Sequence, residues 1–247
     1  MNYAVFDIET RIDKELVRRV FFADRELDAE AAYERMRAEL ERQGRDMFPH
    51  SVHVPVSIAV GNVDERHVLR SVETLGGPQA DEKAMVREFW SRLDRFRGTL
   101  VSFNGRRFDL PVLELAALRY GCVAPTYFNE PSRFRGRGAE GHYDLYDFLT
   151  NQGACGIRGG LDLLAKLVGL PGKEEVGGRL VQELWERGEI EAIHRYCRRD
   201  VIQTYALFLH VERMRGRISD EEFETARRES ALFFRELESS ETVRNTP

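Results

Sequence analysis

Residues 3–10 read YAVFDIET and place two acidic side chains at the end of a short aromatic and β-branched run. Residues 3–8 predict a strand that opens the domain. Residues two apart on a strand point to the same face, so Asp7 and Glu9 project together while Ile8 points away. Adjacent carboxylates repel each other unless a cation lies between them, and Mg²⁺ prefers such oxygen ligands. An exposed acidic strand end, screened by solvent, is the alternative.

A third acidic residue, Asp109, lies in the stretch NGRRFDLP at 104–111. The stretch connects a short apolar strand predicted at 99–103 with a helix predicted at 110–120, which has proline in its first turn. Asp109 has two interpretations. It is either the N-cap of this helix, a role that contributes about 1 kcal/mol, or a carboxylate delivered toward the first pair. These two interpretations are only partly compatible, because an oxygen that caps a helix is less free to bind a metal.

The stretch YCRRD at 196–200 lies on a long helix predicted from about 189 to 215. Tyr196 and Asp200 are four residues apart and therefore share one helical face, beside the apolar stripe. If this helix packs on the sheet, the pair can point into a cleft. The alternative is a boundary tyrosine and a solvated aspartate.

The rest of the chain predicts a mixed sheet flanked by helices. Further strands are predicted at 54–60 and 66–72, joined by a hairpin turn at 61–64. Further helices are predicted at 28–43, 81–96, 161–168 and 179–187. The helix at 28–43 is rich in charge, and we assign it to the solvent-facing surface with no chemistry.

One α/β domain over residues 1–215 is the simplest organisation. Residues 216–247 are expected to form a C-terminal helix and a disordered tail. Ser219 and Glu222 have the spacing of a capping box at the start of that helix.

The composition restricts the class of protein. The 247 residues are 42% hydrophobic and 32% charged, with a net charge of −5. We find no apolar run long enough to span a bilayer and no secretory signal, so we expect a cytoplasmic protein. The three cysteines have no zinc-ligand spacing. Most non-specific nucleic-acid binders are basic, so this chain would hold nucleic acid locally, through bound cations and a small basic rim.

Together, FDIET, NGRRFDLP and YCRRD resemble the three exonuclease motifs of the DEDD superfamily in its tyrosine branch, in the same order and with similar spacing. The chain resembles the proofreading exonuclease domain of family B DNA polymerases, and more specifically the stand-alone, polymerase-B-like 3′→5′ exonucleases, over roughly residues 3–211. The histidine branch has a histidine five positions before the last aspartate. Here that position is Arg195, and His194 is out of register, which favours the tyrosine branch.

The resemblance implies a ribonuclease H-like fold and two-metal hydrolysis of phosphodiester bonds with Mg²⁺ or Mn²⁺. Asp7 would bridge both ions, and Glu9 and Asp200 would hold the ion that activates water. Asp109 would support the second ion, and Tyr196 would orient the water.

The resemblance also indicates the substrate: we expect the 3′ end of single-stranded DNA in preference to RNA. The residues assigned to its binding are Thr10, Asn104, Arg106, Phe108 and Lys173.

Several alternatives stay open from the sequence. Arg106 and Lys173 are either phosphate ligands or solvated loop residues. Arg133, Arg135 and Arg137, interleaved with Phe134, either line a single-strand path or belong to a solvated loop. Asp144 is expected near the site but not as a ligand.

Three other functions also stay open. One is an RNA 3′→5′ exonuclease with the same chemistry, and another is a catalytically idle nucleic-acid-binding module with the same fold. The third is a metal-bound phosphoesterase that acts on a small nucleotide. An idle module would be expected to lack one of the four carboxylates, and all four are present.

Overall fold

The computed structural model describes residues 2–45, 47–77, 81–135, 141–172 and 178–238. A five-stranded sheet in the order β3-β2-β1-β4-β5 forms its centre. The strands are β1 (Tyr3–Ile12), β2 (His53–Val63), β3 (Leu69–Thr74), β4 (Thr99–Ser102) and β5 (His142–Asp144). β1 pairs antiparallel with β2 and parallel with β4, so the sheet is mixed as predicted.

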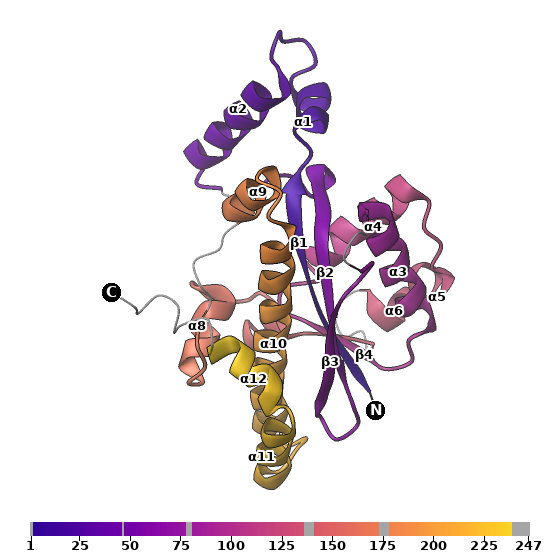
Figure 1. Cartoon of the computed structure of the whole chain (residues 1–247), viewed down its shortest axis with the longest axis vertical. Coiled ribbons are helices and arrows are strands. Elements are labelled where there is room, and N and C mark those ends of the chain that lie inside the picture. The colour runs from indigo at the N-terminus through magenta and orange to yellow at the C-terminus, as the bar shows by residue number, and fades with distance from the viewer. Residues whose placement is uncertain (1, 46, 78–80, 136–140, 173–177, 239–247) are drawn as a thin grey trace.

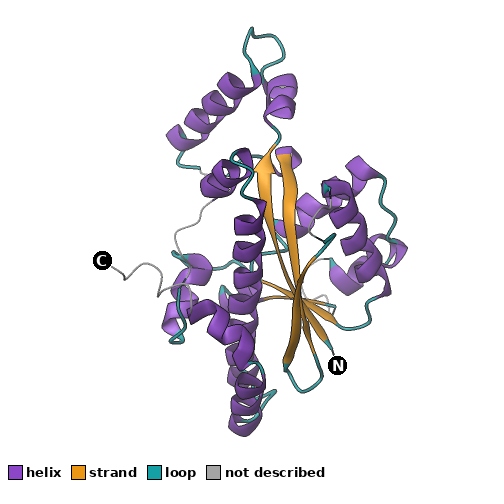
Figure 2. Cartoon of the chain, in the orientation of Figure 1, coloured by secondary structure: helices purple, strands orange, loops and turns teal. Residues whose placement is uncertain are grey.

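Helices cover both faces of the sheet (Figure 2). They are α1 (Lys14–Phe21), α2 (Ala29–Arg42), the 3₁₀ helix η1 (His50–Val52), α3 (Glu82–Arg95), α4 (Asp109–Tyr120), α5 (Pro125–Asn129), α6 (Pro131–Phe134), α7 (Leu145–Leu149), α8 (Gly160–Leu167), α9 (Gly178–Glu186), α10 (Ile190–Met214), α11 (Asp220–Glu229) and α12 (Ala231–Glu238). Helices α3 to α6 lie on one side of the sheet, and α8, α10 and α12 lie on the other (Figure 1). Among the described residues, no helix combines the length and apolar character needed to cross a membrane.

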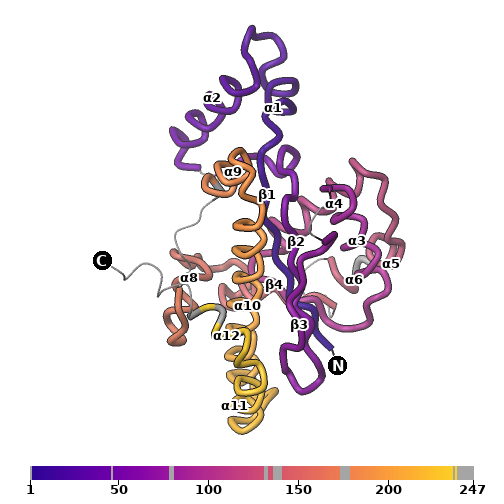
Figure 3. Tube along the Cα trace, viewed as in Figure 1, coloured from indigo at the N-terminus to yellow at the C-terminus, as the bar shows by residue number. Residues whose placement is uncertain are grey.

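The alternation of β1 builds a separate core on each face of the sheet. Phe6 and Ile8 pack with α3 and α4. Val5, from the other face, packs with the buried side of α10. Asp7 and Glu9 follow Val5 in the two-residue period, so they face α10. Figure 3 shows β1 and α10 side by side although they are far apart in the sequence.

A single glycine allows α10 to approach the sheet closely. A Cβ atom on Gly61 of β2 would lie 2.9 Å from Val201 Cγ1 and 3.1 Å from Leu69 Cδ1. Real Cβ atoms essentially never lie within 3.0 Å of another atom, so a larger residue at this position would require Val201 or its helix to shift.

The structure differs from the sequence predictions in several places. Residues 61–63 continue β2, and the turn follows them, with Asp64 N–H donating to Val68 O. Helix α1 and strand β5 were not predicted. The capping box of Ser219 and Glu222 is confirmed, but the C-terminal segment contains two helices, α11 and α12, in place of one. The expected disordered tail falls largely on 239–247, outside the described residues.

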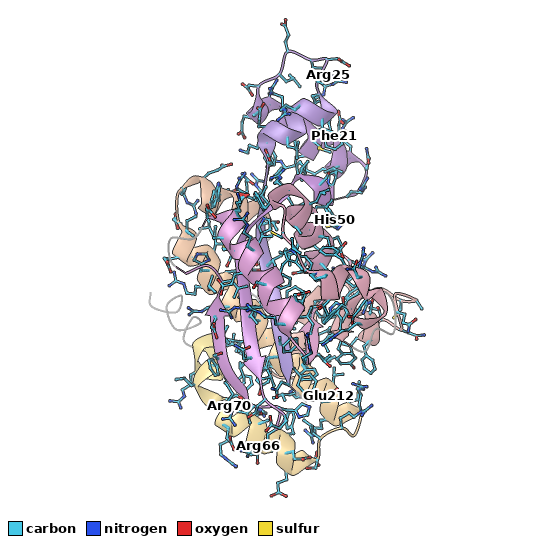
Figure 4. The ribbon with its side chains drawn as sticks, turned by 90° about the vertical axis from the view of Figure 1, so that its right-hand side faces the viewer. Phe21, Arg25, His50, Arg66, Arg70 and Glu212 are labelled. Carbon is cyan, nitrogen blue, oxygen red and sulfur yellow. The ribbon has the colours of Figure 1, made fainter. Side chains whose placement is uncertain are left out.

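Helices α1 and α2 form an arm that extends beyond the carboxyl end of β1 (Figure 1). The arm has a small core of its own, in which Val17, Tyr33 and Leu40 are buried. Figure 4 shows Phe21 and Arg25 in the outer part of the arm and His50 at its base, with Arg66, Arg70 and Glu212 at the opposite end of the molecule.

Candidate active site

Three carboxylates from two elements meet at the carboxyl end of β1. Asp7 and Glu9 come from β1, and Asp200 comes from α10. Each offers one oxygen, and these oxygens all lie within 4.8 Å of one another. Asp200 is buried, while Asp7 and Glu9 are partly exposed. Since hard divalent cations are held by clusters of carboxylate oxygens, the donor set fits such an ion.

The packing of α10 on β1 brings the strand pair and the helical pair together. Cys197, one residue after Tyr196, is fully buried, and its Sγ lies 3.4 Å from the backbone oxygen of Asp7. Burial, followed by the charges of Asp7 and Glu9, raises the pKa of the Cys197 thiol well above its usual value. The thiol is therefore neutral, and its contact with Asp7 brings this part of α10 close to the carboxylate pair.

Tyr196 and Asp200 both line the cavity in front of the carboxylates. Their shared face follows from the four-residue spacing on α10. His194, by contrast, is not among the residues that line this cavity. Its Nδ1 forms a 2.9 Å hydrogen bond with Ser57 Oγ.

Asp109 is not the N-cap of α4, so that interpretation is wrong. The helix begins at Asp109 itself, and the flanking residue, Phe108, makes no side-chain cap hydrogen bond. Instead, Asp109 Oδ1 accepts a 3.1 Å hydrogen bond from the backbone N–H of Ile8, which lies between Asp7 and Glu9 on β1. The fourth carboxylate is thus held beside the first pair and lines the same cavity, although it lies outside the three-carboxylate cluster.

The connection before α4 is held in place by Asp144 at the end of β5. Its Oδ1 accepts from the backbone N–H of Asn104 at 2.9 Å, and its Oδ2 accepts from that of Arg106 at 2.8 Å. Asn104 has a φ of 65°, a left-handed conformation that asparagine tolerates better than most residues. Burial raises the pKa of Asp144. Asp144 therefore positions the connection that delivers Asp109, a role that the sequence did not reveal.

Thr10, Asn104 and Phe108, three of the residues assigned to substrate binding, line the cavity. Thr10 Oγ1 lies 2.8 Å from Nδ1 of His53, and Phe108 packs edge-on against the His53 ring with centroids 5.0 Å apart. Burial lowers the pKa of His53 to about 4, so this histidine is neutral near pH 7. The register of β1 against β2 shifts between Glu9 and Thr10, a bulge of the kind that re-aims side chains beside active sites.

Two cationic residues were also assigned to substrate binding from the sequence, Arg106 and Lys173. Arg106 is paired with Asp147, with Nε 2.9 Å from Oδ2, and is not among the cavity-lining residues. Lys173 lies outside the described residues.

The proposed single-strand path at residues 133–137 is not supported. Phe134 is fully buried, so its ring is not available for base stacking. Arg133 donates to the backbone oxygen of Phe96 at 2.8 Å, and Arg135 pairs with Glu114 at 3.2 Å. Arg137 lies outside the described residues.

The cavity measures about 630 Å³ and is open to solvent. The four carboxylates line one part of it, which we call the acidic floor. The cavity is also lined by residues from α2, the following loop and α9 that were not assigned to the site from the sequence: Tyr33, Arg37, Leu40, Glu41, Arg45, Met47 and Arg179.

A family model described as "predicted 3′-5′ exonuclease related to the exonuclease domain of PolB" matches residues 45–245. The chain belongs to this family. Asp109, Tyr196 and Asp200 fall within the matched residues, while Asp7, Glu9 and the α1–α2 arm precede them. No match was found among curated proteins.

Solved structures that are similar to this chain include the family B DNA polymerase from the archaeon Pyrobaculum calidifontis. Its TM-score is 0.56 at 17% identity, over 86% of this chain and 24% of the polymerase. Escherichia coli exonuclease I in complex with a dT13 oligonucleotide has a TM-score of 0.45 at 13% identity, over 87% of this chain and 42% of that protein. The chain thus spans less than half of each protein. The predicted ribonuclease H-like fold is confirmed, and family and fold together support a nuclease.

Proposed function

We propose that this protein is a metal-dependent 3′→5′ exonuclease that acts on single-stranded DNA. The observation that carries the proposal is the convergence of Asp7, Glu9 and Asp200 within 4.8 Å at the floor of an open cavity. Asp200 is buried and the other two carboxylates are partly exposed, so a cation between them would reduce their mutual repulsion.

The carboxylates have distinct roles in this proposal. Asp7 would contribute to the sites of both divalent cations, Mg²⁺ or Mn²⁺. Glu9 and Asp200 would help to hold the ion that activates water, and Asp109 would support the other. When bound, such ions lower the pKa of a coordinated water and stabilise negative charge on the phosphate. The protein itself therefore needs no strong general base.

Tyr196 orients the attacking water through its hydroxyl. It lies one helical turn before Asp200 on the same face of α10, and both side chains line the cavity. Thr10, Asn104 and Phe108 line the cavity around the same floor and contact the terminal nucleotide in this proposal.

The direct test uses 5′-labelled and 3′-labelled single-stranded DNA oligonucleotides with Mg²⁺, Mn²⁺ or EDTA. We expect the 5′-labelled strand to shorten one nucleotide at a time and the 3′ label to appear at once as mononucleotide, both abolished by EDTA. Matched RNA oligonucleotides test the substrate class, and faster degradation of RNA would replace DNA as the proposed substrate.

A charge-removing variant tests the site itself. Asp7→Asn should remove nearly all turnover, and the matched control Glu65→Gln, in the exposed turn after β2 at the far end of the sheet, should remove none. Full activity in EDTA, or unchanged turnover of Asp7→Asn, would contradict the proposal.

A further inference from the structure

The cavity that contains the carboxylates is also lined by positively charged residues. Three arginines from separate elements line it: Arg37 of α2, Arg45 of the loop after α2, and Arg179 of α9. The one carboxylate among the lining residues of these segments is Glu41. We call these three arginines the cationic wall. The cavity therefore has an acidic floor that fits cations and a basic wall that fits anions.

Helical periodicity separates the cationic wall from the other arginines of α2. Tyr33, Arg37 and Leu40 are four and three residues apart, so they share the face of α2 that looks into the cavity. Arg35 and Arg42 lie roughly 140–160° around the helix from Arg37 and are not among the cavity-lining residues.

The ion pairs of the wall are weak enough for a phosphate to replace them. Arg37 pairs with Glu34 and lies 3.9 Å from Glu41, and Arg179 pairs with Glu183 at 3.2 Å. These carboxylates are 45–65% exposed. Exposed pairs of this kind contribute little to stability, because solvent screens the charges. A guanidinium can form two parallel hydrogen bonds to a phosphate, so exchange of partner is favourable.

The root of the arm is fixed to the body of the protein on two sides. On the α9 side, the backbone N–H of Ile12 donates to Gln182 Oε1 at 2.7 Å, and Lys14 Nζ lies 2.5 Å from Glu186. On the α4 side, Arg119 pairs with Asp13 at 3.1 Å.

Lys14 also joins α1 to α2. Its Nζ lies 2.5 Å from Glu30 and 4.7 Å from the centroid of the Tyr33 ring. Several contacts thus fix α1 and α2 to each other and to the rest of the protein, and Arg37 and Arg45 line the same cavity as the carboxylates. A binding surface that is arranged before the ligand arrives loses less entropy on binding.

We infer that the cationic wall binds the sugar–phosphate backbone of the nucleotides next to the terminal one, an inference that rests on the proposed function. A strand whose last phosphodiester lies on the acidic floor must leave the cavity, and the wall offers its phosphates positive charge along one side. The wall thereby gives a chain with a net charge of −5 a local site for a polyanion. Longer strands should bind more tightly than a substrate with a single phosphodiester.

The test compares Arg37→Gln/Arg45→Gln with the matched control Arg35→Gln/Arg42→Gln, which removes the same charge from the other face of α2. Binding of 5′-fluorescein-labelled dT12 is measured by anisotropy at several NaCl concentrations, with Ca²⁺ in place of Mg²⁺ to suppress turnover. Each phosphate contact contributes about 0.7 to the slope of log K against log[salt] for a single strand. The slope should therefore decrease by about 1.4 in the wall variant and stay unchanged in the control. Arg37→Lys/Arg45→Lys should restore it.

Hydrolysis of thymidine 5′-(p-nitrophenyl phosphate), which has one phosphodiester, separates this inference from the proposed function. The wall variant should hydrolyse it like the wild type, because the acidic floor is intact. A wild type that binds dT12 with the expected slopes but hydrolyses nothing would overturn the proposed function and support the wall. Equal slopes in the wild type and the wall variant, equal losses in both double variants, or no binding of dT12 by the wild type would overturn the inference.

Discussion

Asp109 has two roles that can be tested separately: it accepts a hydrogen bond from β1, and in the proposed mechanism its charge supports a cation. Asp109 Oδ1 accepts from Ile8 N–H at 3.1 Å, and both residues are buried. β4 pairs with β1 only as far as Val5, so beyond that point Asp109 takes the place of a strand partner. Asp109→Ala removes the acceptor, while Asp109→Asn keeps an oxygen in the same place and removes only the charge.

The expected magnitudes differ for the two variants. A buried donor left without an acceptor costs about 1–3 kcal/mol, and hydrogen bonds to charged groups lie in the upper part of this range. We expect Asp109→Ala to lower the free energy of unfolding by about 2–3 kcal/mol, a decrease in Tm of about 4–12 °C for a chain of this size. Asp109→Asn should stay within about 1 kcal/mol of the wild type.

Turnover, unlike stability, should decrease in both variants. Both variants lose the carboxylate that supports the second cation in the proposed mechanism. Loss of an outer partner of a metal ligand alone costs 10–100-fold, so both should lose at least about 100-fold in turnover. Urea or thermal unfolding gives the stabilities, and oligonucleotide degradation gives the rates. If Asp109→Asn were as unstable as Asp109→Ala, the role of the hydrogen bond would be refuted. If Asp109→Asn kept wild-type turnover, the role of the charge would be refuted.

Three further perturbations test the surroundings of the site. Because burial lowers the pKa of His53 to about 4, the unfolded chain takes up a proton between pH 6.5 and 4 that the folded state does not. The contribution of neutral His53 to the free energy of unfolding is therefore fully present above about pH 6.5 and decreases by up to roughly 3 kcal/mol as the pH falls toward 4. Urea midpoints for His53→Gln should depend less on pH than those of the wild type. Gly61→Ala places a Cβ 2.9 Å from Val201 Cγ1 and should lower the free energy of unfolding, measured in urea, by about 1–3 kcal/mol. Turnover should also decrease, because Val201 adjoins Asp200. Unchanged stability would show that α10 accommodates the methyl group. Mg²⁺ or Mn²⁺ should raise the Tm of the wild type in a thermal-shift assay, through preferential binding to the folded state, but not that of Asp7→Asn; equal shifts in both would place the bound ion elsewhere.

Local chemistry made several features predictable from the sequence. The two-residue period of β1 places Asp7 and Glu9 on one face, and the four-residue period of α10 does the same for Tyr196 and Asp200. These periods are properties of the backbone, so the side-chain directions follow once the element type is known. The mixed sheet flanked by helices and the capping box at Ser219 were predictable for the same reason.

Predictions failed where a distant partner decides the outcome. Asp109 has the local signature of a helix cap, but its acceptor oxygen is used by Ile8, 101 positions earlier in the chain. Phe134 lies in a stretch rich in glycine and arginine that resembles a loop, yet it is fully buried against the aromatic core. Helix α2 has the composition of a solvated helix, and nothing in its sequence indicates that Arg37 looks into a cavity.

The sequence by itself therefore determined which residues are candidates for the chemistry and how neighbouring pairs are oriented, because strand and helix periods fix those directions locally. Only the tertiary structure decided that Asp200 meets Asp7 and Glu9, because α10 and β1 are far apart in the sequence and come together only by packing. It also decided that Arg37 of the arm lines the same cavity as the carboxylates, with the arm held by contacts of Lys14 and Asp13 to residues more than 100 positions away. Such contacts depend on how elements pack, and packing is a property of the whole chain rather than of any one segment.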